Sequence, residues 1–233
     1  MSIGGWAVNI RLQWSDLIAL STSVDAVRDG LDGLDIAAAL DGAEAAMPGS
    51  TSAGRVAAAA GLFGLVWPDA SRNLLRYLEN TGEPQQINVN RMMKDMPDLN
   101  NNTHTEVKKF ADDAKDDAIS SGASGPVTYT FSTPWEPEYA EQKEHPNWFY
   151  ATGGYQRATE GTVTVYPPTE SNPEWTYKYN YRVHVADRYN WDGKKATPIG
   201  PLTITDKELQ ELHRAGLAQE YDLIGESSVV SGP

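Results

Sequence analysis

The stretch Tyr181–Lys195, YRVHVADRYNWDGKK, joins an alternating strand pattern to side chains that could carry out chemistry. Successive strand residues point to opposite faces, so Asp187 continues the row formed by Val183 and Val185. A carboxylate at the end of an apolar row is half removed from water, which costs free energy unless it is paired or coordinates something. We therefore expect Asp187 to lie at the mouth of the core.

Further polar side chains follow Asp187 within six residues. Tyr189 extends the same row, and a tight turn after Asp192 brings Lys194 back toward it. Two acids, a phenol and the amide of Asn190 are the groups that a divalent-cation, phosphate or proton-transfer site requires. The alternative is a structural corner, in which Asp187 caps a turn or pairs with a neighbouring base.

A second candidate pair, His213-Arg214, lies in a predicted C-terminal helix. His213 falls one turn after Leu209, so it borders the apolar face that packs on the sheet. A histidine that exchanges protons near neutral pH, beside an arginine suited to phosphate oxygens, fits phosphoryl chemistry. A core-edge histidine beside a surface arginine is the alternative interpretation.

Several other classes of site are excluded by the composition. The chain has no cysteine, which excludes disulfides and thiolate metal sites. No two histidines have the HxxxH spacing of a zinc site, and no P-loop, GxGxxG or GxSxG motif occurs. A net charge of -13, with no Lys/Arg run longer than two, argues against nucleic-acid binding. No organic cofactor is expected.

Helical patterns dominate the chain up to about residue 120. Apolar spacings of three and four predict a helix over residues 15–34 and a second helical region over 53–80. Pro68 fits the first turn of a helix that opens within this region. A capping box beginning at Thr103 predicts the start of a further helix.

From Pro126 onward the apolar period changes to two. Strands are predicted around residues 127–131, 148–156, 162–166, 175–185, 202–204 and 218–224, with a helix from the capping box at Thr205 to Gly216. The expected fold is α+β: a helical N-terminal half, then an antiparallel, curved or barrel-like β domain with one C-terminal helix. We predict a delivery or packaging region at 1–120 and an effector domain at 126–233.

Three segments of the second half resemble a C-terminal domain common in actinobacterial secreted proteins. They are NWFYATGGYQ, YRVHVADRYNWDGKK and ITDKELQELHRAGLAQEYDLIGES. In such polymorphic-toxin-like proteins a helical leader, similar to WXG-type substrates of type VII secretion, precedes a β-rich effector region. The resemblance implies a bacterial protein with a secretion partner. The N-terminus MSIGGWAVNIRLQW has no basic n-region and no continuous apolar run, so export without a Sec signal peptide is expected.

The candidate site also resembles the colicin M family, whose pattern is Asp-x-Tyr-Asp followed by His-Arg. Asp187 and Tyr189 match the first two positions, Asn190 stands at the third, and His213-Arg214 matches the last pair in type. Those bacteriocins cleave the lipid-linked peptidoglycan precursor at its diphosphate and need a divalent cation. The resemblance implies this target and reaction, and an immunity protein as a further partner.

These observations predict an exported antibacterial toxin that acts at the cell envelope. If it is catalytic, we expect a divalent-metal-dependent phosphodiester or diphosphate hydrolase, with Mg²⁺ or Ca²⁺. The expected metal ligands are Asp187, Asn190 and Asp192, and the expected catalytic residues are Asp187, Tyr189, His213 and Arg214. His213 would act as general acid or base, and Arg214 would steady a phosphate oxygen.

Two other functions remain open from the sequence. One is a non-catalytic secreted binding or structural module that uses an aromatic β surface. Its candidate residues are Trp148, Tyr150, Tyr155, Trp175 and Tyr177. The other is a membrane-damaging toxin, suggested by the run VAAAAGLFGLVW at residues 56–67. That run is too short and too rich in Ala and Gly to span a bilayer, so no transmembrane segment is expected.

Overall fold

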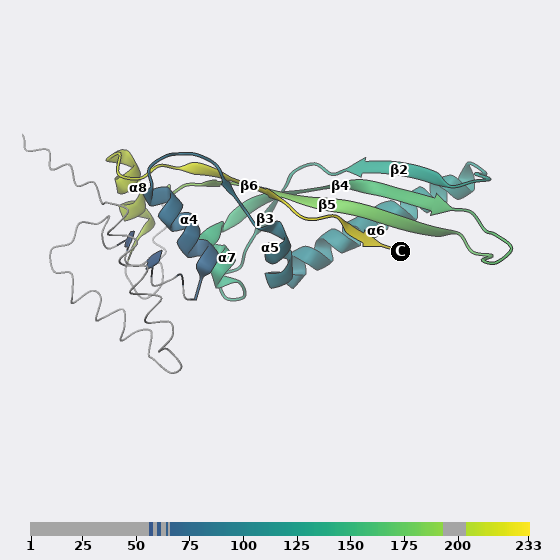
Figure 1. Cartoon of the computed structure of the whole chain (residues 1–233), viewed down its shortest axis with the longest axis horizontal. Coiled ribbons are helices and arrows are strands. Elements are labelled where there is room, and N and C mark those ends of the chain that lie inside the picture. Colours follow the sequence, from purple (N-terminus) through teal and green to yellow (C-terminus); the bar gives the residue numbers. More distant parts are fainter. Residues whose placement is uncertain (1–55, 58–59, 62–63, 65, 193–203) are drawn as a thin grey trace, which may run out of the picture.

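The computed structural model describes residues 56–57, 60–61, 64, 66–192 and 204–233 (Figure 1). The helix predicted over 15–34, five residues of the 56–67 run (58, 59, 62, 63 and 65) and residues 202–203 of the strand predicted at 202–204 lie outside the described residues. The helices are α4 (Pro68–Leu78), α5 (Val89–Asp95), α6 (Pro97–Ser120), α7 (Pro146–Ala151) and α8 (Asp206–Arg214). Within these residues, no helix combines the length and apolar composition needed to cross a bilayer.

A sheet of seven strands forms the centre of the molecule. The strands are β1 (Gln85–Gln86), β2 (Val127–Ser132), β3 (Glu136–Tyr139), β4 (Gly154–Tyr166), β5 (Thr176–Tyr189), β6 (Tyr221–Glu226) and β7 (Val230–Gly232). Their order is β1-β6-β5-β4-β2, with β3 also paired to β4 and β7 to β5. The predicted α+β class and single C-terminal helix are confirmed.

The sheet differs from the prediction in closure and in direction. It is not closed into a barrel, because β1 and β2 lie at opposite edges of the described sheet with three strands between them. It is also mixed, since β1 pairs with β6 in parallel while the other pairs are antiparallel. A two-residue parallel strand has no sequence pattern long enough to predict.

The long hairpin of β4 and β5 extends beside α6 (Figure 1). One face of the hairpin packs against α6, and β5 supplies an unbroken buried row to that face, as the alternation predicted. The buried row consists of Tyr179, Tyr181, Val183 and Val185, each at most 4% exposed. Gly161 in β4 lets the two strands approach, because a Cβ there would overlap the carbonyl oxygen of Asn180.

The predicted helix start at Thr103 is wrong. Helix α6 already begins at Pro97, and Thr103 lies inside it, fully buried, where its Oγ1 donates a hydrogen bond to the Leu99 carbonyl at 2.9 Å. Proline fits the first turn of a helix because its missing N–H would be unpaired there anyway. Pro97, and not the capping-box pattern at Thr103, therefore marks the start of the helix.

The aromatic segment predicted as a strand over 148–156 is helical in its first part. Pro146 opens α7, which ends at Ala151, and β4 begins only at Gly154. Gly153 has φ +65°, a left-handed conformation that lets the chain leave the helix. This break places Phe149 and Tyr150 on a helix instead of the sheet.

A buried arginine fastens α6 and β3 to β4. Arg157 of β4 is 4% exposed, and its Nη1 donates to Glu106 of α6 at 2.8 Å. Its Nε donates to Glu138 of β3 at 3.1 Å, and Glu136 lies 3.6 Å from Nη2. A buried charge is tolerated when it is paired and hydrogen-bonded. The network fixes β3, whose last residue is Tyr139.

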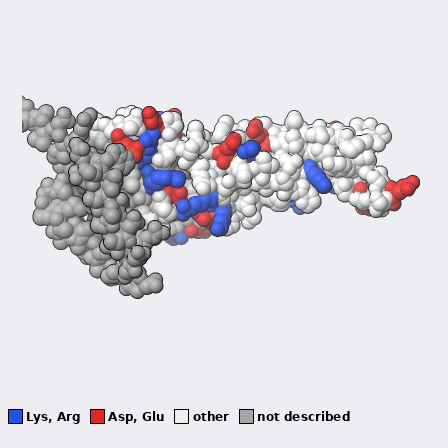
Figure 2. All heavy atoms as spheres, in the orientation of Figure 1, with Lys and Arg blue, Asp and Glu red and all other residues white. Residues whose placement is uncertain are grey.

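The outer face of α6 carries exposed charges, including Lys108, Lys109, Asp112 and Asp113. On the side shown in Figure 2, basic and acidic side chains are interspersed along the described surface. Mixed charges of this kind hydrate a surface without creating a field of one sign.

Candidate functional site

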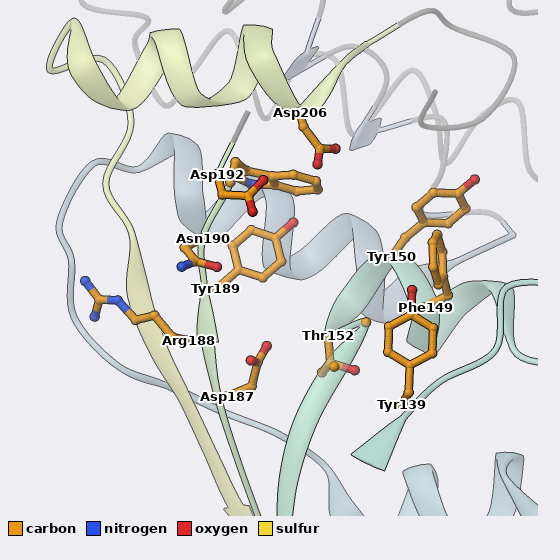
Figure 3. A pocket seen from close by; sticks show the side chains of 13 residues that line it. Tyr139, Phe149, Tyr150, Thr152, Asp187, Arg188, Tyr189, Asn190, Asp192 and Asp206 are labelled. Atoms are coloured by element: carbon orange, nitrogen blue, oxygen red, sulfur yellow. The ribbon is translucent and has the colours of Figure 1, made fainter. Parts of the chain in front are cut away.

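A pocket of about 270 Å³ opens where β5 ends, beside β3, the α7–β4 junction and the start of α8 (Figure 3). It is lined by Tyr139, Phe149, Tyr150, Thr152, Gly153, Gly154, Asp187, Arg188, Tyr189, Asn190, Trp191, Asp192 and Asp206. Four of the six residues predicted from the sequence, Asp187, Tyr189, Asn190 and Asp192, are therefore brought together.

Asp187 has the environment that its place in the strand predicted. It lies opposite Leu223 of β6 and continues the inward row after Val185. Burial raises the pKa of Asp187 from 3.8 to about 7, and a hydrogen bond from the backbone N–H of Arg188 opposes the rise. A carboxyl that titrates near neutral pH can both give and accept a proton, as a general acid or base must.

The neighbouring arginine does not neutralise Asp187. Arg188 is exposed, and its Nη1 donates to Asp222 at 2.8 Å. Its Nη2 lies 3.9 Å from Glu220. Within the described part of the chain, desolvation with no cationic partner is therefore what raises the pKa of Asp187.

Tyr189 belongs to the core as well as to the pocket wall. It is 5% exposed and stacks on Tyr221 at 5.2 Å between ring centroids, with the edges of Tyr77 and Trp191 at 6.0 and 5.6 Å. Burial raises its pKa well above the usual value, so the phenol stays protonated at physiological pH. Tyr189 therefore holds the strand end in place by packing against these rings.

The predicted metal ligands do not form a ready cation site. Asn190 and Asp192 are exposed, and in Figure 3 the ring of Tyr189 stands between the carboxyl groups of Asp187 and Asp192. Across the described part of the chain, no three histidine or acidic side chains are grouped so that they could hold a metal ion. A requirement for Mg²⁺ or Ca²⁺ remains a prediction.

His213 and Arg214 do not line the pocket. They occupy the C-terminal end of α8, whereas Asp206 at its N-terminal end does line it. With a rise of about 1.5 Å per residue, the seven residues from Asp206 to His213 span roughly 10 Å along the helix axis. His213 Nδ1 lies 3.2 Å from the Ala218 carbonyl oxygen, and Arg214 is exposed. Their catalytic roles remain predictions.

The capping box that opens α8 is confirmed. The Thr205 hydroxyl accepts a hydrogen bond from the Glu208 N–H at 3.2 Å, and the Glu208 carboxylate accepts one from the Thr205 N–H at 2.9 Å. This cap fixes the first turn of the helix. It thereby sets the position of Asp206 at the pocket.

An aromatic wall, formed by Tyr139, Phe149 and Tyr150, faces the pocket, and only Tyr150 was among the aromatic residues predicted to form a binding surface. The Phe149 ring makes edge contacts with Tyr139 and Tyr150 at 6.0 and 5.0 Å between centroids. Tyr139 is 46% exposed, and Trp67 packs behind Tyr150 at 4.9 Å. The rings come from β3 and α7, which the sequence pattern does not place together.

Helix α7 is held against α4 by a buried hydrogen-bonded pair. Asn147 donates from Nδ2 to the Asp69 carboxylate at 2.7 Å, and its Oδ1 accepts from the backbone N–H groups of Asp69 and Ala70 at 3.0 and 3.2 Å. Asp69 is 2% exposed and lies 3.3 Å from Nη2 of Arg91. The helix that carries two rings of the wall is thus anchored.

The aromatic surface proposed from the sequence is only partly available. Trp148 and Tyr155 are 2% and 3% exposed and belong to the core, where the indole N–H of Trp148 donates to Asp95 at 3.1 Å. Tyr150 is the one member of that predicted set that lines the pocket.

No protein-family model and no curated protein matches the sequence. Among solved structures, the chain is similar to PaeM, a colicin M-like bacteriocin produced by Pseudomonas aeruginosa, with 16% identity and a TM-score of 0.30 over 70% of this chain and 50% of that one. It is also similar to the truncated bacteriocin syringacin M from Pseudomonas syringae pv. tomato DC3000, with 15% identity and a TM-score of 0.30, over 70% and 59% of the two chains. The match thus spans 50% and 59% of the length of these two structures.

Proposed function

We propose that this chain is an exported antibacterial toxin whose pocket hydrolyses a phosphodiester or diphosphate of a cell-envelope substrate, such as a lipid-linked peptidoglycan precursor. The observation that carries the proposal is the carboxyl of Asp187, which titrates near pH 7 inside a pocket. The match of Asp187 and Tyr189 to the colicin M sequence pattern motivates the choice of substrate.

In this mechanism the protonated form of Asp187 acts as general acid. Water attacks the phosphorus atom and releases one proton to solvent, the bond from phosphorus to the leaving oxygen breaks, and the Asp187 proton passes to that oxygen. A neutral carboxyl also avoids repelling an anionic substrate, which an ionised one would do. The remaining carboxylate then takes a proton from solvent, which restores the acid.

The test is toxicity in a heterologous bacterium that expresses the full chain in the cytoplasm or in the periplasm. We expect growth to stop only with periplasmic expression, and Asp187→Asn to abolish the effect. Asp113→Asn, the same change at an exposed position of α6, is the matched control and should remain toxic. Hydrolysis of purified lipid-linked precursor, with and without a chelator, then tests the substrate and the predicted metal requirement.

Full toxicity of folded Asp187→Asn would contradict the proposal. The variants His213→Ala and Arg214→Ala test the roles predicted for the far end of α8 in the same assay. Loss of toxicity without loss of folding would assign these residues to the reaction. The predicted immunity protein would be sought as a neighbouring gene product that restores growth.

The second candidate function is a non-catalytic secreted binding module. The observation that favours it is the aromatic wall, whose outermost ring, Tyr139, is 46% exposed. A module of this kind would keep its ligand when Asp187 is changed to Asn, and purified protein would turn over no envelope precursor.

A further inference from the structure

We propose that the aromatic wall is a subsite for a single sugar ring of the ligand, next to Asp187. The inference deepens the proposed function, on which it rests in taking the sugar to belong to the same envelope substrate. It follows from the shape of the wall, from the polar groups that face it and from the size of the pocket.

The wall presents an aromatic ring that is both exposed and held in place. Tyr139 lies opposite Gly154 in the β3–β4 pair, and its Cδ2 would be 3.6 Å from a Cβ at that glycine, so the ring rests against the strand. The edge of Phe149 supports it from α7. An aromatic face with such support offers an apolar platform that loses little conformational freedom on binding.

The groups that face the wall are oxygen-rich. Asp187, Thr152, Asn190 and Asp192 line the same pocket, and Figure 3 shows Asp187 and Thr152 on the side across from Tyr139. A pyranose ring has an apolar C–H face and a rim of hydroxyl groups, which both donate and accept hydrogen bonds. Aromatic rings on one side and carboxyl, amide and hydroxyl groups on the other match those two surfaces.

The size of the described pocket suits a single sugar ring. Its volume of about 270 Å³ is just below the range of roughly 300–1,000 Å³ that holds drug-sized ligands. Among the described residues that line the pocket, Arg188 is the one basic side chain, and it is paired with Asp222. A neutral, hydroxylated ring therefore suits the wall better than an anionic group does.

The probe is N-acetylglucosamine, titrated into the full chain and followed by saturation-transfer NMR. We expect saturable binding at millimolar concentration, weakened about 2- to 10-fold by Tyr139→Ala, as is typical for the loss of one aromatic contact. Tyr139→Phe keeps the ring and should bind as the wild type does. Trp135→Ala removes an aromatic residue that is 51% exposed but does not line the pocket, so it should also leave binding unchanged.

Three results of these binding titrations would overturn the subsite: no saturable binding, equal weakening by Tyr139→Ala and Trp135→Ala, or tighter saturable binding of tetramethylammonium than of the sugar. The last would identify a site for a cation. Asp187→Asn separates this proposal from the hydrolase, because the asparagine amide can still hydrogen-bond a sugar hydroxyl but cannot transfer a proton. Turnover should be lost, whereas sugar binding should weaken less than in Tyr139→Ala. If the wild-type protein binds the sugar but hydrolyses no precursor, the subsite stands and the hydrolase is refuted. If the Tyr139→Ala variant hydrolyses the precursor with unaltered kinetics, the subsite is refuted.

Discussion

Changing Asp187 to Asn should make the protein more stable at pH 8 while leaving its stability at pH 4 almost unchanged. The carboxyl titrates near 7 in the fold, and its ordinary value is 3.8. A raised pKa means that the folded state holds the proton more tightly than the unfolded state. The stability that protonated Asp187 contributes is therefore fully present below about pH 4. It is lost as the pH rises from about 4 to about 7.

The size of the effect follows from the same two values. At about 1.36 kcal/mol for each pH unit between them, full ionisation of Asp187 destabilises the folded protein by about 4 kcal/mol. Water reaches part of the side chain and screens the charge, so we expect about 2–4 kcal/mol. Asparagine has nearly the same shape and no charge, and the variant escapes this cost.

The assay is urea unfolding of wild type and Asp187→Asn at several pH values between 4 and 8.5. The difference in unfolding free energy should grow through the window from pH 4 to 7 and then level off. Asp113→Asn controls for the loss of one negative charge and should show no such growth. A constant difference in unfolding free energy across this range would refute the conclusion that desolvation raises the pKa of Asp187. A stable Asp187→Asn variant would also ensure that any loss of toxicity is not caused by unfolding.

Three further changes test the packing around the site, each by urea unfolding. Tyr189→Ala should lower the free energy of unfolding by about 3–5 kcal/mol, because the ring fills the space between Tyr221, Tyr77 and Trp191. Tyr189→Phe keeps the ring and should lower it by less than about 1 kcal/mol. Equal losses in the two variants would refute the packing role of the ring. Arg157→Met should lower the free energy of unfolding by about 3–5 kcal/mol, because it leaves Glu106 and Glu138 without their partner. A decrease below about 1 kcal/mol would show that the network is solvated. Gly161→Ala should lower the free energy of unfolding by roughly 1–3 kcal/mol, because the new Cβ would overlap the Asn180 carbonyl. An unchanged urea midpoint would mean that β4 and β5 can move apart to accept the methyl group without loss of stability.

Local patterns predicted the elements that carry their own signals. The alternation in β5 placed Val183, Val185 and Asp187 on one inward row, and the pKa of Asp187 reflects that position. The capping box at Thr205 and the stop at Gly216 were also correct, since both depend on contacts within one helical turn. Helix caps and the alternation of strand faces depend only on residues close together in the sequence. A single sequence can therefore predict both.

Long-range pairing could not be predicted in this way. Tyr139 reaches the pocket because β3 pairs with β4, and Phe149 because α7 interrupts a segment with the composition of a strand. The periodicity of the helix predicted which face of α8 carries His213, but it does not predict which end of the helix borders the pocket. The aromatic wall depends on contacts between β3 and α7 that leave no periodic signal.

The parallel pairing of β1 with β6 has a consequence for the order in which the chain folds. Gln85 lies opposite Leu223, so 138 residues separate two strands that must meet, and β6 also supplies the Tyr221 that stacks on Tyr189. Contacts of such sequence separation form late and slowly. On the ribosome, the hairpin of β4 and β5 can pair as soon as it emerges, but the sheet edge beside Asp187 must wait until residues 221–226 have been made. The newly made chain therefore has no finished pocket until β6 has emerged, which would limit any activity up to that point.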